Sequence, residues 1–489
     1  MKTEQILGIF KEIMKVPRES GHEEQIIAWL RNWAAEHRLE CKADRAGNIL
    51  ISRNATNGCE NSPTIVLQSH SDMVCEKNAG VEHDFSKDPI IAVEEEGWLI
   101  AKDTTLGADC GIGMAAQLAV LEDDSMPHGR IEALFTTSEE TGLTGAKSLE
   151  KDFISGKILI NLDSEDEGEL FIGCAGGIDT TAHFKYKTIP ATKSHVKALF
   201  RVFGAEGGHS GDDIDKNRAN AVKILAGFLY QVMDKYDIEL YRIDGGNKKN
   251  AIAREAYAAI GFSKRDERGI LKIYNANIAA TKDEFAFSDS GVDFSVERIG
   301  IEDVKSGKML NEPKKAIDPD TAAALIYALT AAPHGVLAMS NRIKGLVETS
   351  TNLASVKMAS ANRIVVGTSQ RSSRESSRDH AAEQTEACFA LAGASVTHHN
   401  KYPGWQPKMD SPLLEVTRAA YKKLFGKEPV VRAIHAGLEC GLFLDKYPEL
   451  DMISFGPTLR KVHAPGERLD LASLDRFRRL LEQVILDLK

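Results

Sequence analysis

The sequence predicts an α/β fold: a discontinuous domain with a central mixed, mostly parallel sheet covered by helices, plus an inserted α+β domain of two βαββ-like units. Two observations support this prediction. Short apolar runs typical of buried strands alternate with helical segments over residues 1–188 and again over 401–489. Between them, residues 189–400 show two similar groups of strands and helices. We therefore predict a domain of 1–188 with 401–489, and a second domain of 189–400.

The size and composition of the chain agree with two globular domains. Its 489 residues exceed a typical single core, and 43% hydrophobic with 27% charged residues is ordinary for a globular protein. The net charge of −10 and the absence of a basic tract argue against nucleic acid as a partner. The sequence lacks the apolar N-terminal segment of a signal peptide, and it has no run of about 18 apolar residues. We therefore expect neither export nor a membrane span. The cytoplasm is the expected compartment.

The seven cysteines are odd in number and include no Cys-x-x-Cys spacing. They argue against a disulfide framework and against a zinc site built from thiolates.

The terminal portions alternate strands and helices in a regular order. A capping-box spacing from Ser20 to Glu23 predicts that a helix begins there. Apolar runs predict strands at 47–51, 64–69, 131–136 and 158–162. The last portion predicts a helix at 413–424, a strand at 452–455 and a closing amphipathic helix at 471–488.

The inserted portion contains two similar groups of elements. The first has a strand at 195–203, a helix at 217–233 and strands near 238–243 and 256–262. The second has a helix at 320–329, strands near 354–358 and 363–368, and a helix at 376–391. We expect the two groups to share one sheet with the helices on one face. The sequence similarity between them is too weak to establish a repeat.

Three predicted strands of the terminal portions end in residues that can carry chemistry. One runs into His70 and Asp72, another ends before Glu139 and Glu140, and a third ends before Asp163. In an α/β sheet, the carboxyl ends of strands are where sites are built. Strand alternation puts His70 and Asp72 on the same side, so Asp72 can accept the proton of the second imidazole nitrogen of His70.

Two further residues complete a candidate metal site. Asp109 lies in a glycine-flanked segment at the start of a helix, where both carboxylate oxygens are free to bridge two cations, and His463 lies in a Gly/Pro-rich loop. Taken singly, such an Asp is more often a helix cap and such a His a surface residue. Together with the strand-end acids they supply the ligands of a zinc, cobalt or manganese pair. Paired metals of this kind activate water for hydrolysis.

The order of these motifs resembles a known family. The segments SHSDMV, GADCGIGMA, TTSEETGLTGA, INLDSED, GGHSGDDI and HAPGER span almost the whole chain. They resemble the di-metal peptidases that include peptidase T and carboxypeptidase G, and in particular the bacterial aminoacyl-histidine (Xaa-His) dipeptidases of the carnosinase type. The family commonly has Gly where this chain has Ser69, a difference that affects backbone packing and no ligand.

The resemblance implies a role for each candidate residue and an activity. Asp109 would bridge two divalent ions, most simply zinc with cobalt or manganese as alternatives. His70 and Asp163 would complete one metal site, and Glu140 and His463 the other. Glu139 would be the general base that takes a proton from a metal-bridging water, and Asp72 would orient His70. The implied reaction is hydrolysis of dipeptides, both Xaa-His (carnosine-type) and other unblocked ones.

The resemblance also implies that the inserted domain is a lid that contacts the substrate. His209 would polarise the scissile carbonyl and Asn250 would contact the substrate, although from spacing alone His209 is equally a turn residue. Arg371 at a strand end suits the substrate's C-terminal carboxylate, because a guanidinium binds a carboxylate through two hydrogen bonds; without the resemblance a surface cation is equally expected. Gly437, and with it Glu439, could face the amino end of the substrate.

Two rival functions are compatible with parts of this pattern. A deacylase of N-acyl amino acids would use the same metals and Arg371 but would need no acceptor for an amine. A non-catalytic protein on the same fold is disfavoured, because every inferred ligand and Glu139 are present. The expected partners are small dipeptides, with neither nucleic acid nor membrane, and a homodimer is left open.

Overall fold

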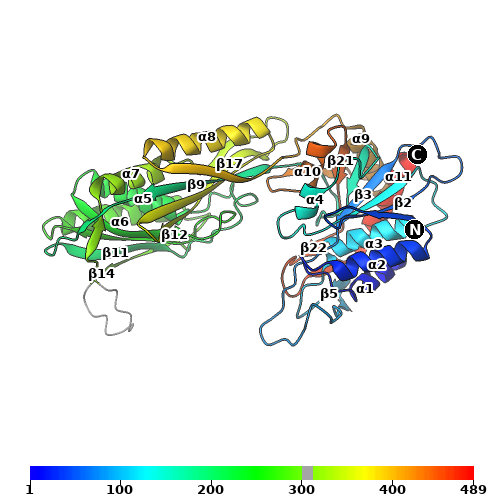
Figure 1. The fold of residues 1–489 in the computed structure, drawn as a ribbon, viewed down its shortest axis with the longest axis horizontal. Helices are drawn as coiled ribbons and strands as arrows, with labels where there is room; N and C mark the ends of the chain where they lie inside the picture. The colour runs from blue at the N-terminus through cyan, green and yellow to red at the C-terminus, as the bar shows by residue number, and fades with distance from the viewer. Residues whose placement is uncertain (300–311) are drawn as a thin grey trace. The chain divides into compact units, whose positions relative to one another are not determined.

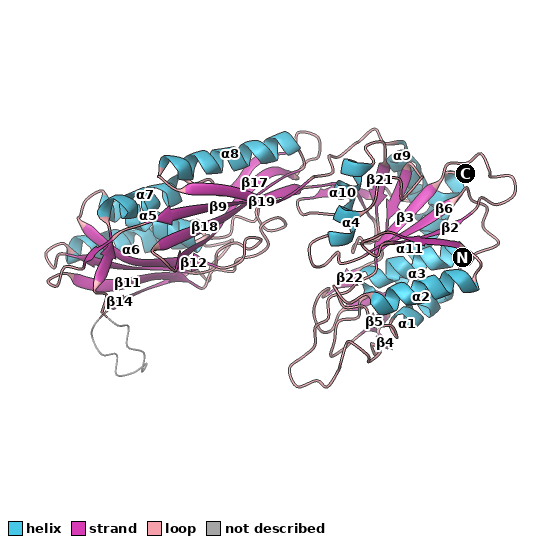
Figure 2. Ribbon diagram, in the orientation of Figure 1, coloured by secondary structure: helices cyan, strands magenta, loops and turns pink. Residues whose placement is uncertain are grey.

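The computed structural model describes residues 1–299 and 312–489, which form two compact units (Figures 1 and 2). The first unit comprises residues 1–174, 405–433 and 438–489. The second comprises residues 175–404 together with the short segment 434–437. The chain thus leaves the first unit, forms the second and returns, as expected for a discontinuous domain with an insertion.

The first unit contains an eight-stranded mixed sheet in the order β1-β2-β6-β3-β7-β21-β8-β20. Strands β6, β3, β7 and β21 are parallel, whereas β1, β2 and β8 pair antiparallel to their neighbours. The predicted mixed sheet is therefore confirmed, with its parallel strands in the centre. The strands span β1 Glu40–Ala43, β2 Ile49–Arg53, β3 Ile65–His70, β6 Ile131–Thr136, β7 Ile158–Asn161, β8 Glu169–Cys174, β20 Val430–Ile434 and β21 Asp451–Ser454.

Helices cover this sheet, and a smaller sheet adjoins it (Figure 2). The helices are α1 Thr3–Ile13, α2 Glu24–Glu36, α3 Ala108–Glu122, α4 Thr144–Ser148, α9 Pro412–Phe425, α10 Glu439–Lys446 and α11 Leu471–Asp487. Helix α3 is buried along almost its whole length, which explains its uniformly apolar sequence. The small sheet has the order β22-β23-β5-β4, with β4 Val93–Glu95, β5 Trp98–Ile100, β22 Leu459–Arg460 and β23 Arg468–Asp470.

The parallel register brings three strand ends to one edge of the sheet. His70 at the end of β3 pairs with Thr136 at the end of β6, and Gln68 pairs with Asn161 at the end of β7. The residues that follow these strands therefore emerge side by side, as the carboxyl ends of parallel strands do.

The second unit is built on a nine-stranded sheet in the order β14-β11-β13-β12-β17-β18-β9-β19, with β16 paired to β17 outside this path. These strands span β9 Gly176–Lys185, β11 Val196–Phe203, β12 Ile238–Gly246, β13 Ala256–Phe262, β14 Asp293–Arg298, β16 Gly335–Met339, β17 Val347–Ala359, β18 Arg363–Ser372 and β19 Ser395–Tyr402. A short pair, β10 Thr188–Pro190 with β15 Lys315–Ile317, lies beside it.

Each half of this sheet repeats one βαββαβ pattern. The first half runs β11, α5 (Ala221–Met233), β12, β13, α6 (Glu267–Glu284) and β14. The second half takes β9 as its first strand and continues with α7 (Pro319–Ala331), β17, β18, α8 (Glu375–Leu391) and β19. The strand orders mirror each other about the β12–β17 pair. The first predicted βαββ-like unit is thus extended by helix α6 and strand β14, and the second by strands β9 and β19.

The core of the second unit lies between the helices and one face of the sheet. Tyr274 of α6 packs edge to face against Phe200 of β11 and Phe228 of α5, whose own rings are tilted to each other, and Phe184 of β9 meets Phe389 of α8. The boundary of the unit differs from the predicted one, at 174/175 and 404/405 in place of 188/189 and 400/401. The reason is that β9 pairs with β18 and β19, which assigns residues 176–185 to the second sheet.

The predicted helix start at Ser20 is wrong, because α2 begins at Glu24 and Glu23 makes no capping bond with its side chain. Ser20 Oγ donates instead to Asp72 Oδ2 over 2.7 Å. Among the described residues, no helix is both long and apolar enough to cross a membrane.

Candidate metal centre and substrate-binding residues

The two oxygens of Asp109 face two different histidines. Oδ1 lies 2.9 Å from His70 Nε2, and Oδ2 lies 3.1 Å from His463 Nε2. Asp163 approaches His70 Nε2 at 3.3 Å, and Glu140 Oε1 approaches His463 Nε2 at 2.7 Å. The structure therefore brings these five predicted ligands together as two groups that share one carboxylate.

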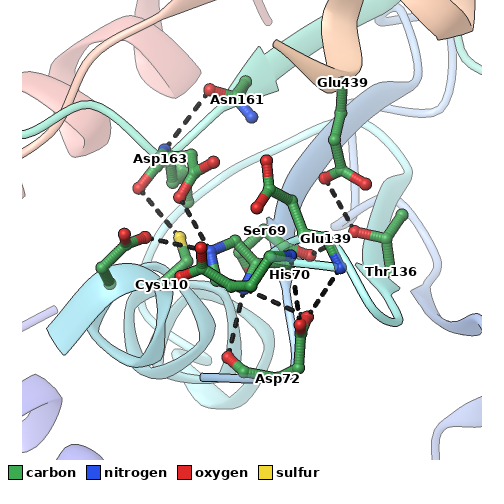
Figure 3. Close-up of polar contacts among 12 residues, drawn as sticks. Ser69, His70, Asp72, Cys110, Thr136, Glu139, Asn161, Asp163 and Glu439 are labelled. Atoms are coloured by element: carbon green, nitrogen blue, oxygen red, sulfur yellow. Dashed lines mark hydrogen bonds and ion pairs between the residues drawn. The ribbon is translucent and has the colours of Figure 1, made fainter. Parts of the chain in front are cut away.

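Asp72 orients both His70 and the turn that carries the two glutamates. Its carbonyl and its carboxylate Oδ1 lie 3.1 and 3.3 Å from His70 Nδ1, while its carboxylate accepts the backbone N–H groups of Glu139 at 3.0 Å and Glu140 at 3.3 Å (Figure 3). Burial opposes its charge, but the bonds from His70, Ser20 and Glu139 outweigh burial and lower the pKa of Asp72 to about 2. The sequence predicted that Asp72 orients His70, but it did not predict that Asp72 also holds the turn of Glu139 and Glu140.

The turn after β6 separates the two adjacent acids. Ser138 has a φ of 50°, in the left-handed region that non-glycine residues rarely adopt, and both its N–H and its hydroxyl donate to Glu23 Oε1 at 2.7 Å. Glu140 then turns toward His463, whereas the side chain of Glu139 remains near His70. Burial is the main cause that raises the pKa of Glu139, and the charges of Asp163, Glu439 and Glu140 raise it further against the opposing effect of His70.

Glu467 fixes the loop that presents Asp109. Its Oε2 accepts the N–H groups of Leu106 and Gly107 at 2.7 and 3.0 Å, and its Oε1 accepts that of Ala108 at 2.8 Å and, at 3.4 Å, that of Asp109. These are the unpaired donors at the start of α3, which a carboxylate satisfies well. Sequence reasoning missed Glu467. The available signal was its place in the HAPGER motif, four residues after His463.

Glu439 is a second buried acid close to the centre. It is 1% exposed, and its Oε2 accepts hydrogen bonds from Gln68 Nε2 at 2.6 Å and Thr136 Oγ1 at 2.8 Å, whereas its Oε1 has no hydrogen-bond partner among the described residues. Burial, opposed by His70 and reinforced by Asp163, raises the pKa of Glu439 to about 8. From the sequence, Glu439 was predicted only as a possible neighbour of the substrate's amino end beside Gly437.

The donor set fits a pair of divalent ions. Among the described residues, three groups of side chains each bring their donor atoms within 4.8 Å of one another: His70 with Asp109, Cys110 and Asp163; His70 with Glu139 and Glu140; and Asp109 with Glu140 and His463. Asp163 Oδ1 is buried and has no hydrogen-bond donor among the described residues; the nitrogen beside it, His70 Nε2, is 3.3 Å away and lies nearer to Asp109. Buried carboxylates that converge on imidazole nitrogens need a cation to neutralise them.

The second unit holds the other predicted site residues. His209 lies in the loop before α5, and its Nδ1 is approached by the N–H groups of Gly211 and Asp212 at 3.3 and 3.2 Å and by Asp212 Oδ2 at 3.3 Å. Asn250 is exposed and its segment supports this loop, since Ser210 N–H donates to the Asn250 carbonyl at 2.8 Å. These contacts occupy Nδ1 and leave Nε2 as the nitrogen that can meet another molecule.

Arg371, near the end of β18, is a buried cation to which no described residue offers a carboxylate partner. It is 7% exposed, and its bonds go to Ser210 Oγ at 3.3 Å and to the Tyr402 hydroxyl at 2.9 Å. Across residues 1–299 and 312–489, no carboxylate oxygen lies within 4.0 Å of its guanidinium. An arginine held by hydroxyl groups keeps charge-assisted donors for an external anion.

The segment 434–437 belongs with these residues, although the sequence placed it in the other domain. His435 Nε2 lies 2.7 Å from Ser350 Oγ, and the His435 carbonyl sits so close to Gly211 that a β-carbon there would collide with it. A β-carbon at Gly437 would lie 3.0 Å from the Tyr402 ring. His209, Asn250, Arg371 and Gly437 thus share one region of the second unit.

Comparisons with known proteins agree with this geometry. The sequence pattern of peptidase family M20/M25/M40 matches residues 66–487. The chain is 39% identical over 480 residues to a cytosol non-specific dipeptidase of Escherichia coli (strain K12), covering 98% of this chain and 96% of the relative. The structure resembles an aminoacylhistidine dipeptidase from Vibrio alginolyticus, with a TM-score of 0.89, 36% identity, and 98% and 96% of the two chains covered. An aminopeptidase PepT from Bacillus cereus, at 17% identity and a TM-score of 0.57 over 100% and 99% of the chains, shares the fold.

Proposed function

The chain belongs to peptidase family M20/M25/M40, and we propose that it is a two-metal dipeptidase that hydrolyses unblocked dipeptides, Xaa-His dipeptides among them. The observation that carries this proposal is the position of Asp109, whose two oxygens face His70 and His463 separately. That arrangement suits a carboxylate shared by two cations. The cytoplasmic location remains a prediction, supported by the cytosolic relative.

We assign each metal-binding group to the residues that converge in it. One ion would be held by His70, Asp109 and Asp163, and the other by Asp109, Glu140 and His463. Imidazole and carboxylate donors suit zinc, with cobalt or manganese as alternatives. When bound, the pair supplies a Lewis acid for the scissile carbonyl and lowers the pKa of water at the site.

Glu139 is proposed as the general base. It is the acid of the adjacent pair that does not turn toward His463, and burial holds its pKa well above the ordinary range. Its carboxylate would accept one proton from the attacking water, whose oxygen bonds to the carbonyl carbon. As the C–N bond breaks, the same group would return that proton to the leaving amine.

Three features support an unblocked dipeptide as the substrate. Arg371, without a carboxylate of its own, suits the C-terminal carboxylate of the substrate, and His209 Nε2 and the exposed Asn250 suit polar contacts to the peptide. Gly437 is placed beside Tyr402 in the same region. Glu439 keeps one buried oxygen without a donor, which suits the free ammonium of the substrate. An N-acyl amino acid would leave that oxygen unpaired, and this favours a dipeptidase over a deacylase.

The test is the substitution Glu139→Gln, assayed with Gly-His or β-Ala-His and with an N-acetyl amino acid. Wild type should hydrolyse the dipeptides in preference to the acetylated compound. Glu139→Gln should lower kcat by roughly 10²–10⁴-fold or more, while elemental analysis still finds two metals per chain. Loss of metal from the variant, with activity restored by excess metal, would show that Glu139 is a ligand and Glu140 the base.

A further inference from the structure

Cys110 lies inside the first metal-binding group, although the sequence predicted no thiolate there. Its Sγ is within 4.8 Å of donor atoms of His70, Asp109 and Asp163, and the residue is 1% exposed. Figure 3 shows the sulfur directed toward Asp163 beside the His70 ring. The thiol also donates a 3.4 Å hydrogen bond to the Leu162 carbonyl.

The chain makes room for this sulfur. A β-carbon at Gly113 would lie 2.6 Å from Cys110 Sγ and 2.9 Å from the Leu162 carbonyl oxygen, so glycine at 113 allows the thiol to sit next to the end of β7. The backbone at Asp109 and Cys110 departs from helical angles, which directs both side chains before the regular part of α3 begins.

A second observation concerns Asp163, the carboxylate that faces this sulfur. The side chain of Asp163 is 9% exposed, yet its Oδ1 has no hydrogen-bond donor. One imidazole nitrogen, two carboxylates and one sulfur thus lie around one point, and nitrogen, oxygen and sulfur are the donor types that zinc binds.

We propose that Cys110 is a sulfur donor to the metal subsite of His70, Asp109 and Asp163, and that it biases this subsite toward soft and borderline ions such as Cd²⁺ and Zn²⁺ over Mn²⁺. Thiolate ligands favour soft ions, whereas carboxylate sets alone favour hard ones. Binding breaks the S–H bond, the sulfur keeps the electron pair for the ion, and the proton leaves to solvent. The inference rests on the proposed function for the presence of an ion and is independent of the reaction catalysed.

The test uses metal-free full-length protein titrated with Cd²⁺ alone. The wild type should develop a sulfur-to-cadmium charge-transfer band in the ultraviolet, and Cys110→Ser should lose it. Cys174→Ser is the matched control, because Cys174 is equally buried in the same unit, bonds to the Leu438 carbonyl and belongs to no donor group. A band that survives in Cys110→Ser, or disappears in Cys174→Ser, would overturn the proposal.

Competition between Zn²⁺ and Mn²⁺ tests the predicted selectivity. With both ions in excess and the bound metals counted by elemental analysis, Cys110→Ser should lower the Zn²⁺-to-Mn²⁺ preference by roughly tenfold or more. An unchanged ratio would contradict the bias. Cadmium NMR tests the wild-type protein directly and does not depend on the folding of any variant. A cadmium chemical shift characteristic of one sulfur ligand supports the proposal, and a chemical shift characteristic of nitrogen and oxygen ligands alone overturns it. None of these readouts depends on dipeptide hydrolysis.

Discussion

The centre in the first unit and the cluster in the second unit are incomplete in opposite ways. Around Asp109 and Asp163, carboxylates outnumber the donors that the described residues offer, and one buried oxygen of Asp163 has no hydrogen bond from them. Around Arg371, the neighbours are hydroxyl groups, and no described carboxylate reaches the guanidinium. The first region therefore needs a cation and the second an anion. Under the proposed function, metal ions and the carboxylate of a peptide would supply these two charges, and the comparison teaches that the two regions differ in the sign of the charge they can bind.

The largest expected effect comes from removing the shared carboxylate. Asp109→Asn should lose both metals together. The substitution replaces one of the two oxygens that face the two groups with an amide nitrogen, and it removes the negative charge that both groups share. His463→Ala should weaken one metal preferentially, since it touches only the group with Glu140. Metal titration followed by elemental analysis measures both. Independent loss of a single metal in each variant would mean that Asp109 does not bridge.

Removing the support of the Asp109 loop should have a smaller effect. Glu467→Gln leaves one oxygen to accept the N–H groups at the start of α3 and turns an amide donor toward the others. We expect metal affinity to fall roughly 10- to 100-fold, as for other groups that orient ligands. Glu167→Gln is the matched control: Glu167 is another largely buried acid of this unit, bonded to Tyr421 and Arg476. Equal losses in the two variants would assign Glu467 a general structural role.

The smallest effect concerns the cationic region and pH. Burial, and then the nearby charge of Arg371, lower the pKa of His435 to about 3. In the unfolded chain the pKa of His435 is near 6.5, so below that pH the unfolded chain binds a proton at this residue and the folded chain does not. The free energy of unfolding therefore falls as pH drops from about 6.5 toward 3. His435→Gln should remove up to about 1.4 kcal/mol of that loss per pH unit. Urea denaturation at pH 7 and pH 5 measures it, and parallel losses in wild type and variant would contradict a buried neutral His435.

The residues at the strand ends could be predicted from the sequence because parallel strands deliver their carboxyl ends to one edge. His70, Glu140 and Asp163 meet for that reason, and their motifs were specific enough to add Asp109 and His463. The central sheet and the inserted α+β domain were likewise predictable from the apolar periodicity.

Other features depended on contacts between distant segments. Ser20 and Glu23 matched a helix cap locally, but in the fold they bond to Asp72 and Ser138. Residues 434–437 lie in a catalytic-type sequence context but pack with Gly211 and Ser350. No local pattern encodes such partners, because the energy that decides them comes from tertiary hydrogen bonds and packing.

The central claim is that Arg371 binds the carboxylate of the peptide that the metal centre hydrolyses. The most direct measurement is kcat/KM for a free-acid dipeptide and its C-terminal amide in wild type, Arg371→Ala and Arg371→Lys. A charged hydrogen bond is worth roughly 1.5–3 kcal/mol, so Arg371→Ala should slow the free acid by roughly 10- to 150-fold and the amide far less. Arg371→Lys should recover only part, because an ammonium keeps the charge without the two-pronged geometry. A uniform drop for both substrates would contradict the account and leave Arg371 as a structural cation.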